Sequence, residues 1–255
     1  AEIVGLKKRD DYDVAFLKYA ASFDGDKPVF VYYRERIFRR QCGFKWEGEL
    51  HEVVAASGRI VYSPACVYHN KVKRNQPMRN LGIYQRLISR GVKLGARQKF
   101  YYGRELFFNN MLTECVAVLS DFLKGDGWAE NKVEACRTLY RAYMRLGDEN
   151  AAVNALVTAF TVSYPRAEDC CALARFFEEK NDVRSAIYWY ERALGTAEKE
   201  EDGGFINTDY LIYIPAISLC VLYDKAGDYS LAQYYNELAG SVKPDDASYL
   251  YNKKY

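Results

Sequence analysis

Two adjacent residues with the chemistry for catalysis, His51 and Glu52, lie in the segment FKWEGELHEVV, residues 44–54. An imidazole beside a carboxylate can hold a metal ion or move a proton, so the pair is a candidate catalytic site. The only other histidine, His69, ends the apolar run ACVYH at 65–69. The pair also fits an ordinary turn that leads into a strand, so the residues alone leave both interpretations open.

Charged residues that could act on phosphates or metals precede this segment. The run YRERIFRR, 33–40, places Arg34 and Arg36 on one face of a predicted strand and Arg39 on the other. Arginines bind phosphate, although such a run also fits a solvated strand face. The triplet 24–26, Asp-Gly-Asp, resembles a metal-binding Asp-x-Asp, but it falls in a predicted hairpin turn, where Asp-Gly is favoured for backbone reasons. We therefore assign it a turn role.

The composition is that of a globular protein, with 49% hydrophobic and 27% charged residues among 255. A net charge of +2 does not indicate a polyanionic partner. No apolar stretch approaches the roughly 20 residues that span a bilayer, and the first residues do not form a signal peptide. Seven cysteines without a Cys-x-x-Cys predict reduced thiols, mostly buried in helices, and a cytoplasmic location, including the inner face of the membrane.

The elements that would position these residues are strands in the first 70 positions. Apolar runs at 13–23 and 28–38 flank Asp-Gly and predict a β-hairpin. Runs at 52–56 and 59–63 around Ser57-Gly58 predict a second hairpin, and 65–69 is a third short run. We expect a β-rich segment over residues 1–75.

From Pro77 onward the apolar spacing becomes helical, and no later segment is expected to be a strand. After a helix at about 79–91, four helix–turn–helix units repeat in register. Each has a turn residue, a Leu or aromatic residue four positions earlier and a small residue five positions later. The turn residues are Asn110, Gly147, Asn181 and Gly227, the earlier residues are Leu106, Tyr143, Phe177 and Tyr223, and the small residues are Cys115, Ala152, Ala186 and Ala232.

Turn-to-turn spacings of 37, 34 and 46 residues bracket the 34-residue period of the tetratricopeptide repeat (TPR). The sequence therefore predicts an α+β, predominantly α, protein: a small β-rich segment, then an α-α superhelix of about four TPR-like repeats over residues 76–255. An irregular helical bundle is the alternative. Of the 23 tyrosines, Tyr102, Tyr143 and Tyr188 are candidates for a groove that binds a peptide partner or a second copy, and core packing is the other interpretation.

A resemblance to a known family rests on four segments in unbroken order: YRERIFRR, WEGELHEVV, GRIVYSPACVYHNK and RNLGIYQRLISRGVKLGARQKFYYGREL. This order resembles the C-terminal portion of bacterial family 2 glycosyltransferases with a TPR-like tail. The resemblance implies that residues 1–75 end a catalytic domain of the GT-A type. It also implies hexosyl transfer from a nucleotide-sugar to a glycan, lipid or peptide acceptor, with Mg or Mn in the full-length enzyme. Trp46 would stack against a sugar.

The resemblance also suggests roles for the candidate residues. Glu52 would be the base that takes the proton from the acceptor. His51 and His69 would bind the metal or the diphosphate, and Arg34 and Arg36 would supply positive charge to phosphates.

The donor-binding half of such an enzyme needs parallel strands alternating with helices, and no such alternation precedes residue 70. We therefore expect this chain to be inactive by itself and to bind no metal. The alternative function is a non-enzymatic TPR-like interaction module. Nucleic-acid binding, suggested by basic clusters at 70–80 and 90–100, ranks last because the net charge is near zero.

Overall fold

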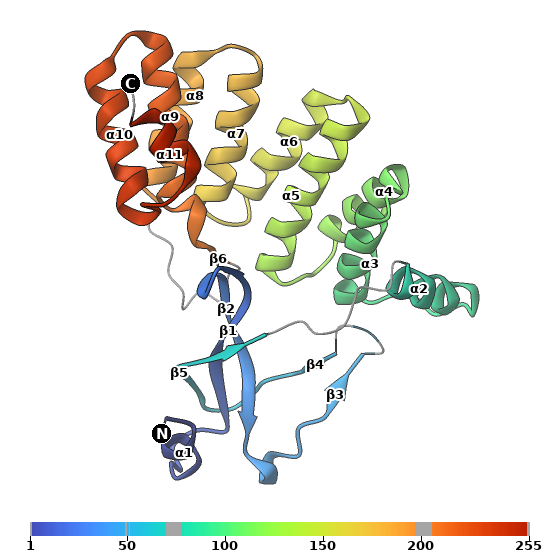
Figure 1. The fold of residues 1–255 in the computed structure, drawn as a ribbon. Helices are drawn as coiled ribbons and strands as arrows, with labels where there is room; N and C mark the ends of the chain where they lie inside the picture. The colour runs from blue at the N-terminus through green and yellow to red at the C-terminus, as the bar shows by residue number, and fades with distance from the viewer. Residues whose placement is uncertain (1, 49, 51, 70–77, 197–205, 254–255) are drawn as a thin grey trace. The chain divides into compact units, whose positions relative to one another are not determined.

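The computed structural model describes residues 2–48, 50, 52–69, 78–196 and 206–253. The described residues form two compact units, residues 2–163 and residues 164–196 with 206–253 (Figure 1). The first unit contains the first five strands and two helix pairs, and the second contains two further helix pairs and a two-residue strand near its middle.

The predicted N-terminal hairpin is confirmed. Strands β1 (Val14–Asp24) and β2 (Lys27–Phe38) pair antiparallel and are joined by a turn at Gly25-Asp26. Gly25 has a φ of +57°, a conformation that glycine adopts without steric cost. A short helix that the sequence did not predict, α1 (Glu2–Lys7), precedes the hairpin, and its Leu6 packs with buried Ala15 and Leu17 of β1.

The predicted second hairpin is wrong. Strand β4 (Val53–Val54) pairs with β3 (Trp46–Glu47), whereas β5 (Ile60–Tyr68) lies parallel to β1. The runs 59–63 and 65–69 thus form one strand, with a register shift where Pro64 and Ala65 intervene. The physical reason is a long-range anchor at the start of β1: the Asp13 carboxylate accepts hydrogen bonds from the backbone N–H of Arg59 at 2.9 Å and from its Nε at 3.2 Å.

The sheet core of the first unit lies on one face of β1. Val61, Ala65 and Val67 of β5 pack there with Ala15 and Leu17. When β5 pairs with β1, these apolar residues pack against the core. A local hairpin with the two-residue β4 would give them no core to pack against. A 3-10 turn, η1 (Arg40–Cys42), follows β2.

The helical part begins with α2 (Arg79–Ser89), close to the predicted helix at 79–91. Four antiparallel helix pairs follow, and each pair matches one predicted repeat. The pairs are α3 (Ala96–Phe108) with α4 (Leu112–Lys124), α5 (Ala129–Leu146) with α6 (Glu149–Ala159), α7 (Ala167–Glu179) with α8 (Val183–Leu194), and α9 (Tyr213–Ala226) with α10 (Tyr229–Val242). A short helix, α11 (Ala247–Asn252), packs on α10.

All four predicted turn residues have left-handed backbone conformations, with φ of +60° at Asn110, +80° at Gly147, +58° at Asn181 and +82° at Gly227. In each turn, the backbone N–H of the residue after the turn residue donates a hydrogen bond to the carbonyl oxygen four positions before the turn residue. The pairs are Leu106 with Met111 at 2.9 Å, Tyr143 with Asp148 at 3.0 Å, Phe177 with Asp182 at 2.9 Å, and Tyr223 with Asp228 at 2.9 Å. This is the Schellman pattern that satisfies helix-end carbonyls, so the repeat register was correct.

The small residues five positions after each turn are buried, as their role in close helix approach requires: Cys115, Ala152 and Ala186 are 0% exposed and Ala232 is 7% exposed. The first pair also has Gly103 against Leu119, where a β-carbon would collide with the leucine side chain. The four helix pairs are therefore TPR-like, and their small residues allow neighbouring helices to approach closely.

Two expectations about the helical half have different outcomes. Cys115, Cys136, Cys170, Cys171 and Cys220 are free and buried, as predicted. The expectation that no strand follows the first helix is wrong, because β6 (Ile206–Asn207) is a two-residue strand, followed by the 3-10 turn η3 (Thr208–Tyr210). Among the described residues, no helix has the length and apolar character needed to cross a membrane.

Candidate functional site

The hairpin that carries the predicted base is formed by β3 and β4, with Trp46 opposite Val54. Gly48 begins its loop at a φ of +100°, and a β-carbon there would lie 3.3 Å from the Leu50 carbonyl oxygen, so this position favours glycine. Glu52 is exposed at the end of the loop, and Trp46 is 60% exposed. His51 lies outside the described residues, so its predicted metal or diphosphate role stays a prediction.

Two other predicted site residues, Arg36 and His69, contact one tyrosine on the sheet, and a third, Arg34, interacts with the tyrosine opposite it. The Arg36 guanidinium carbon lies 4.6 Å from the centre of the Tyr19 ring, and the His69 ring lies 5.4 Å from the same ring. Tyr32, opposite Tyr19 on β2, is also 5.4 Å away. Together with Arg34, which interacts with Tyr32, these residues form a group that we call the Tyr19 cluster: Tyr19, Tyr32, Arg34, Arg36 and His69.

Local irregularities of the strands explain the gathering. Between the pairs Phe16–Glu35 and Ala15–Ile37 the register shifts, which leaves Arg36 as an extra residue. Such a bulge re-aims a side chain, here toward Tyr19. His69 follows β5 directly, and its N–H donates to the Ala20 carbonyl at 2.9 Å, which fixes it at the neighbouring edge of β1.

The Tyr19 cluster contains two guanidinium groups, and one of them is already paired: an Arg34 Nη lies 3.6 Å from Glu35 Oε1, whose side chain is 9% exposed. Burial raises the pKa of Tyr32, while the nearby Arg34 acts in the opposite direction, so the phenol stays neutral beside that guanidinium. The Nε–H of Arg36 is buried and has no hydrogen-bond partner among the residues that the structure describes. A buried donor without an acceptor is costly, and a phosphate or carboxylate oxygen would satisfy it.

The arginine that the sequence placed on the opposite face has a structural role. Arg39 Nε donates to the Tyr12 carbonyl at 2.9 Å and lies 3.8 Å from Asp13 Oδ1. It therefore anchors the end of β2 to the start of β1 and is separate from the Tyr19 cluster.

Trp46 lies on β3 of the two-stranded β3–β4 sheet and Glu52 directly precedes β4, whereas the Tyr19 cluster lies on β1, β2 and the end of β5. The structure therefore brings Arg34, Arg36 and His69 together but places the stacking residue Trp46 on a second small sheet and the predicted base Glu52 in the loop of that sheet. Among the described residues no group of three or more His, Cys, Asp or Glu side chains could hold a metal ion.

The groove candidates differ in exposure. Tyr102 and Tyr143 are half-buried and pack against the core of the first two helix pairs, and the Tyr102 ring lies 5.5 Å from that of Tyr84. Tyr188 is 54% exposed, with the Arg192 guanidinium 5.7 Å from its ring. Only Tyr188 of the three therefore offers most of its ring to a partner.

Sequence reasoning missed Tyr19 and Tyr32, the residues that hold the arginines and histidine together. A signal was present, because the predicted hairpin register places the two tyrosines opposite each other. Sequence reasoning also missed Asn236, which is buried in α10. Its side-chain oxygen accepts no hydrogen bond from any described residue.

Several solved structures are similar to this chain. The MamA protein is 17% identical, with a TM-score of 0.49 over 66% of this chain and 84% of MamA. PilF of Pseudomonas aeruginosa is 11% identical, with a TM-score of 0.48 over 69% and 76%. A proposed kinesin light chain of Podosopora anserina with nearly identical TPR-like repeats is 18% identical, with a TM-score of 0.43 over 61% and 81%. No protein-family model and no curated protein matches the chain.

Proposed function

We propose that these residues belong to a family 2 glycosyltransferase of the GT-A type, with residues 1–75 on the acceptor side of its catalytic domain and residues 76–255 as a TPR-like partner-binding domain. The Tyr19 cluster is the observation that supports this most. A nucleotide-sugar releases a diphosphate, and preorganised guanidinium groups stabilise the charge that develops on it. Arg36, with its buried Nε–H, is the group best suited to that charge, and Arg34, which lies 3.6 Å from Glu35, would add to it.

The proposed reaction assigns one step to each group. Glu52 accepts the proton of the acceptor as the acceptor atom bonds to the anomeric carbon. The bond between that carbon and the diphosphate breaks, and its electron pair leaves with the diphosphate beside Arg34, Arg36 and His69. Trp46, with its ring 60% exposed, stacks against a sugar ring.

A divalent metal, which the family resemblance implies, does not fit the described residues, because no cluster of three ligands exists among them. No step is therefore routed through a metal on this chain. The described residues before α2 also contain a single six-residue helix and no alternation of strands and helices. The donor-binding half would therefore be formed by residues other than these 255, and we expect no sugar transfer by these residues alone.

The test uses an enzyme that combines these residues with a donor-binding half. Glu52→Gln should lower turnover by about 10²–10⁴-fold, because the amide cannot take a proton. Glu47→Gln is the matched control, since Glu47 is an exposed carboxylate on the same hairpin, opposite Val53. Release of nucleoside diphosphate reports turnover, and circular dichroism reports folding. Turnover within a few-fold of the parent in a folded Glu52→Gln enzyme would rule out Glu52 as the base.

A non-enzymatic interaction module is the second candidate, favoured by the exposed ring of Tyr188 beside Arg192. The two candidates separate cleanly, because sugar transfer requires Glu52 and partner binding through the helices does not. Retained peptide binding by Glu52→Gln, measured by calorimetry, together with no transfer activity in any combined enzyme, would favour the module.

A further inference from the structure

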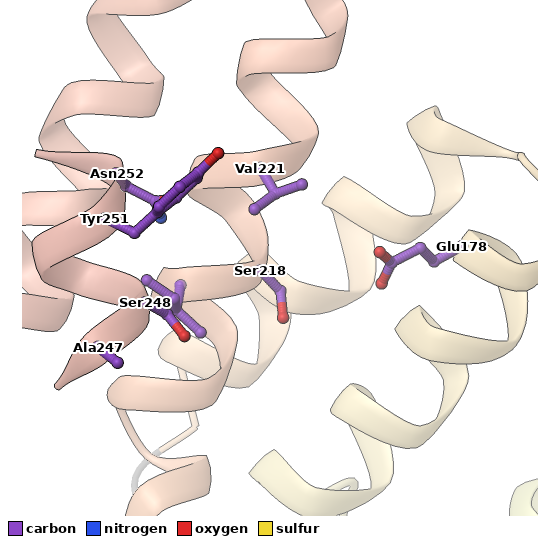
Figure 2. A pocket seen from close by; sticks show the side chains of 8 residues that line it. Glu178, Ser218, Val221, Ala247, Ser248, Tyr251 and Asn252 are labelled. Atoms are coloured by element: carbon purple, nitrogen blue, oxygen red, sulfur yellow. The ribbon is translucent and has the colours of Figure 1, made fainter. Parts of the chain in front are cut away.

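Two adjoining hollows of the second unit share Val221, Tyr251 and Asn252 as lining residues. The first, about 490 Å³, lies between α7, α9 and α11, and Figure 2 shows the Glu178 carboxylate pointing from α7 toward α9, with Tyr251 and Asn252 of α11 beyond it. The second, about 670 Å³, lies between α9, α10 and α11. We call the two together the end groove.

The repeat register shows that the end groove is polar where the other helix pairs are apolar. Nine residues after its turn, the last pair has Asn236, whereas the others have apolar or aromatic residues that are at most 1% exposed: Leu119, Leu156 and Tyr190. Six residues after its turn the last pair has Gln233, where the others have Val116, Val153 and Ile187. Gln233 and Asn236 both line the larger hollow, so the change of residue type coincides with a cavity.

Asn236 supplies a buried group that lacks a partner. Its side chain is 4% exposed, and its Nδ2 donates to the Tyr249 carbonyl at 3.3 Å. Its Oδ1 accepts no hydrogen bond from any residue in the described part of the chain. A buried oxygen of this kind is stabilised by a donor that enters the hollow.

The charged residues of the end groove favour a cationic donor. Three carboxylates line it, from Glu178, Asp224 and Glu237, against one ammonium, from Lys253. Lys253 Nζ already donates to the Tyr249 hydroxyl at 3.0 Å, and that hydroxyl donates to Glu237 Oε2 at 3.3 Å. Negative charge therefore remains in excess.

Two tyrosines complete the lining of the larger hollow. Tyr229 is 70% exposed and Tyr251 is 59% exposed. Aromatic faces attract cations, and guanidinium groups stack on them more often than ammonium groups do.

We propose that the end groove binds an extended polypeptide segment through an arginine side chain, whose guanidinium meets Asp224, Glu237 and the Asn236 oxygen. Arginine fits better than lysine because its five donors in a rigid fork match several acceptors at once. A neutral glycan would leave the excess carboxylate charge unpaired. This binding does not depend on the proposed sugar transfer.

The probe is the peptide acetyl-Gly-Arg-Gly-Arg-Gly-amide, titrated into the full 255-residue chain and followed by NMR of the Asn and Gln side-chain amides. The control peptide replaces arginine by citrulline, which keeps the shape and removes the charge. We expect saturable shifts at Asn236 and Gln233, and at least about tenfold weaker binding of the citrulline peptide. Equal binding of both peptides, binding of neither, or binding of maltotetraose alone would overturn the proposal.

Variants locate the site. Asp224→Asn should weaken binding about tenfold, whereas Glu179→Gln, an exposed carboxylate of the same unit that does not line the groove, should leave it unchanged. Asn236→Leu introduces the residue found in the first two pairs, so it should remove the amide shifts and weaken binding while the melting temperature is kept. Unchanged affinity in both Asp224→Asn and Asn236→Leu would contradict the assignment.

Discussion

Gly103 provides a test of how the TPR-like pairs are held together. It lies inside α3, where glycine costs a helix about 1 kcal/mol relative to alanine. A β-carbon at this position would overlap the Cγ and Cδ2 atoms of Leu119 on α4. Leu119 is 0% exposed and packs inside the hydrophobic cluster of the first two helix pairs, where overpacking costs about 1–3 kcal/mol. Gly103→Ala should therefore destabilise the pair by about 1 kcal/mol net.

The effect of Gly103→Ala on stability should change sign when the Leu119 side chain is truncated. Leu119→Ala by itself should cost about 2–5 kcal/mol through the cavity that it leaves. In that background Gly103→Ala should stabilise the pair by about 1 kcal/mol, because the helix-propensity gain then acts alone. Gly82→Ala in α2 is the matched control, since nothing lies within 4 Å of a β-carbon there, and it should be stabilising in either background.

Hydrogen exchange of the amides in residues 96–124, read by mass spectrometry, is the appropriate assay, because a chain of two units need not unfold in one transition. A Gly103→Ala protein with slower exchange than the parent, or the same sign in both backgrounds, would refute the close-approach explanation.

Two further predictions concern titratable groups. Hydrogen bonds from Arg59, of which the side-chain bond has the larger effect and the backbone bond the smaller, lower the pKa of Asp13 from 3.8 to about 2. These bonds therefore stabilise the folded state fully above about pH 4, and the stabilisation is lost as the pH falls toward 2. In Asp13→Asn the melting temperature should change less between about pH 4 and pH 2 than in the parent. The same fall in melting temperature in both proteins would argue against this role of Asp13. Exposed Cys42 should react with iodoacetamide at about pH 8. Burial raises the pKa of Cys115 to about 12, so this thiol should stay unmodified until the protein unfolds. Labelling of Cys115 in the folded protein, detected by peptide mapping, would contradict its burial.

The helical half could be predicted well because its signals are local. A left-handed turn residue, a small residue five positions later and an apolar residue four positions earlier all act within one helix pair, and each lies where the register placed it, as at Gly147 and Ala152. The first hairpin was predictable for the same reason, because Gly25 sits at its turn. The second hairpin failed because β5 is positioned by Asp13, which lies 46 residues before Arg59 in the chain.

The candidate site shows the same division. Residue types and spacing indicated Arg34, Arg36, His51, Glu52 and His69 as candidates for chemistry, and the family resemblance added Trp46. No local pattern indicated that a bulge would aim Arg36 at Tyr19 or that β5 would bring His69 to that ring.

The sequence by itself determined the TPR-like pairs, because helix periodicity and turn conformation depend on residues a few positions apart. Only the tertiary structure decided which strand lies beside β1, which side chains gather around Tyr19, and that Asn236 faces a hollow where its counterparts face a core. These outcomes depend on pairing and packing between segments distant in the chain, and the free energy of such contacts is shared among residues that no short sequence window contains.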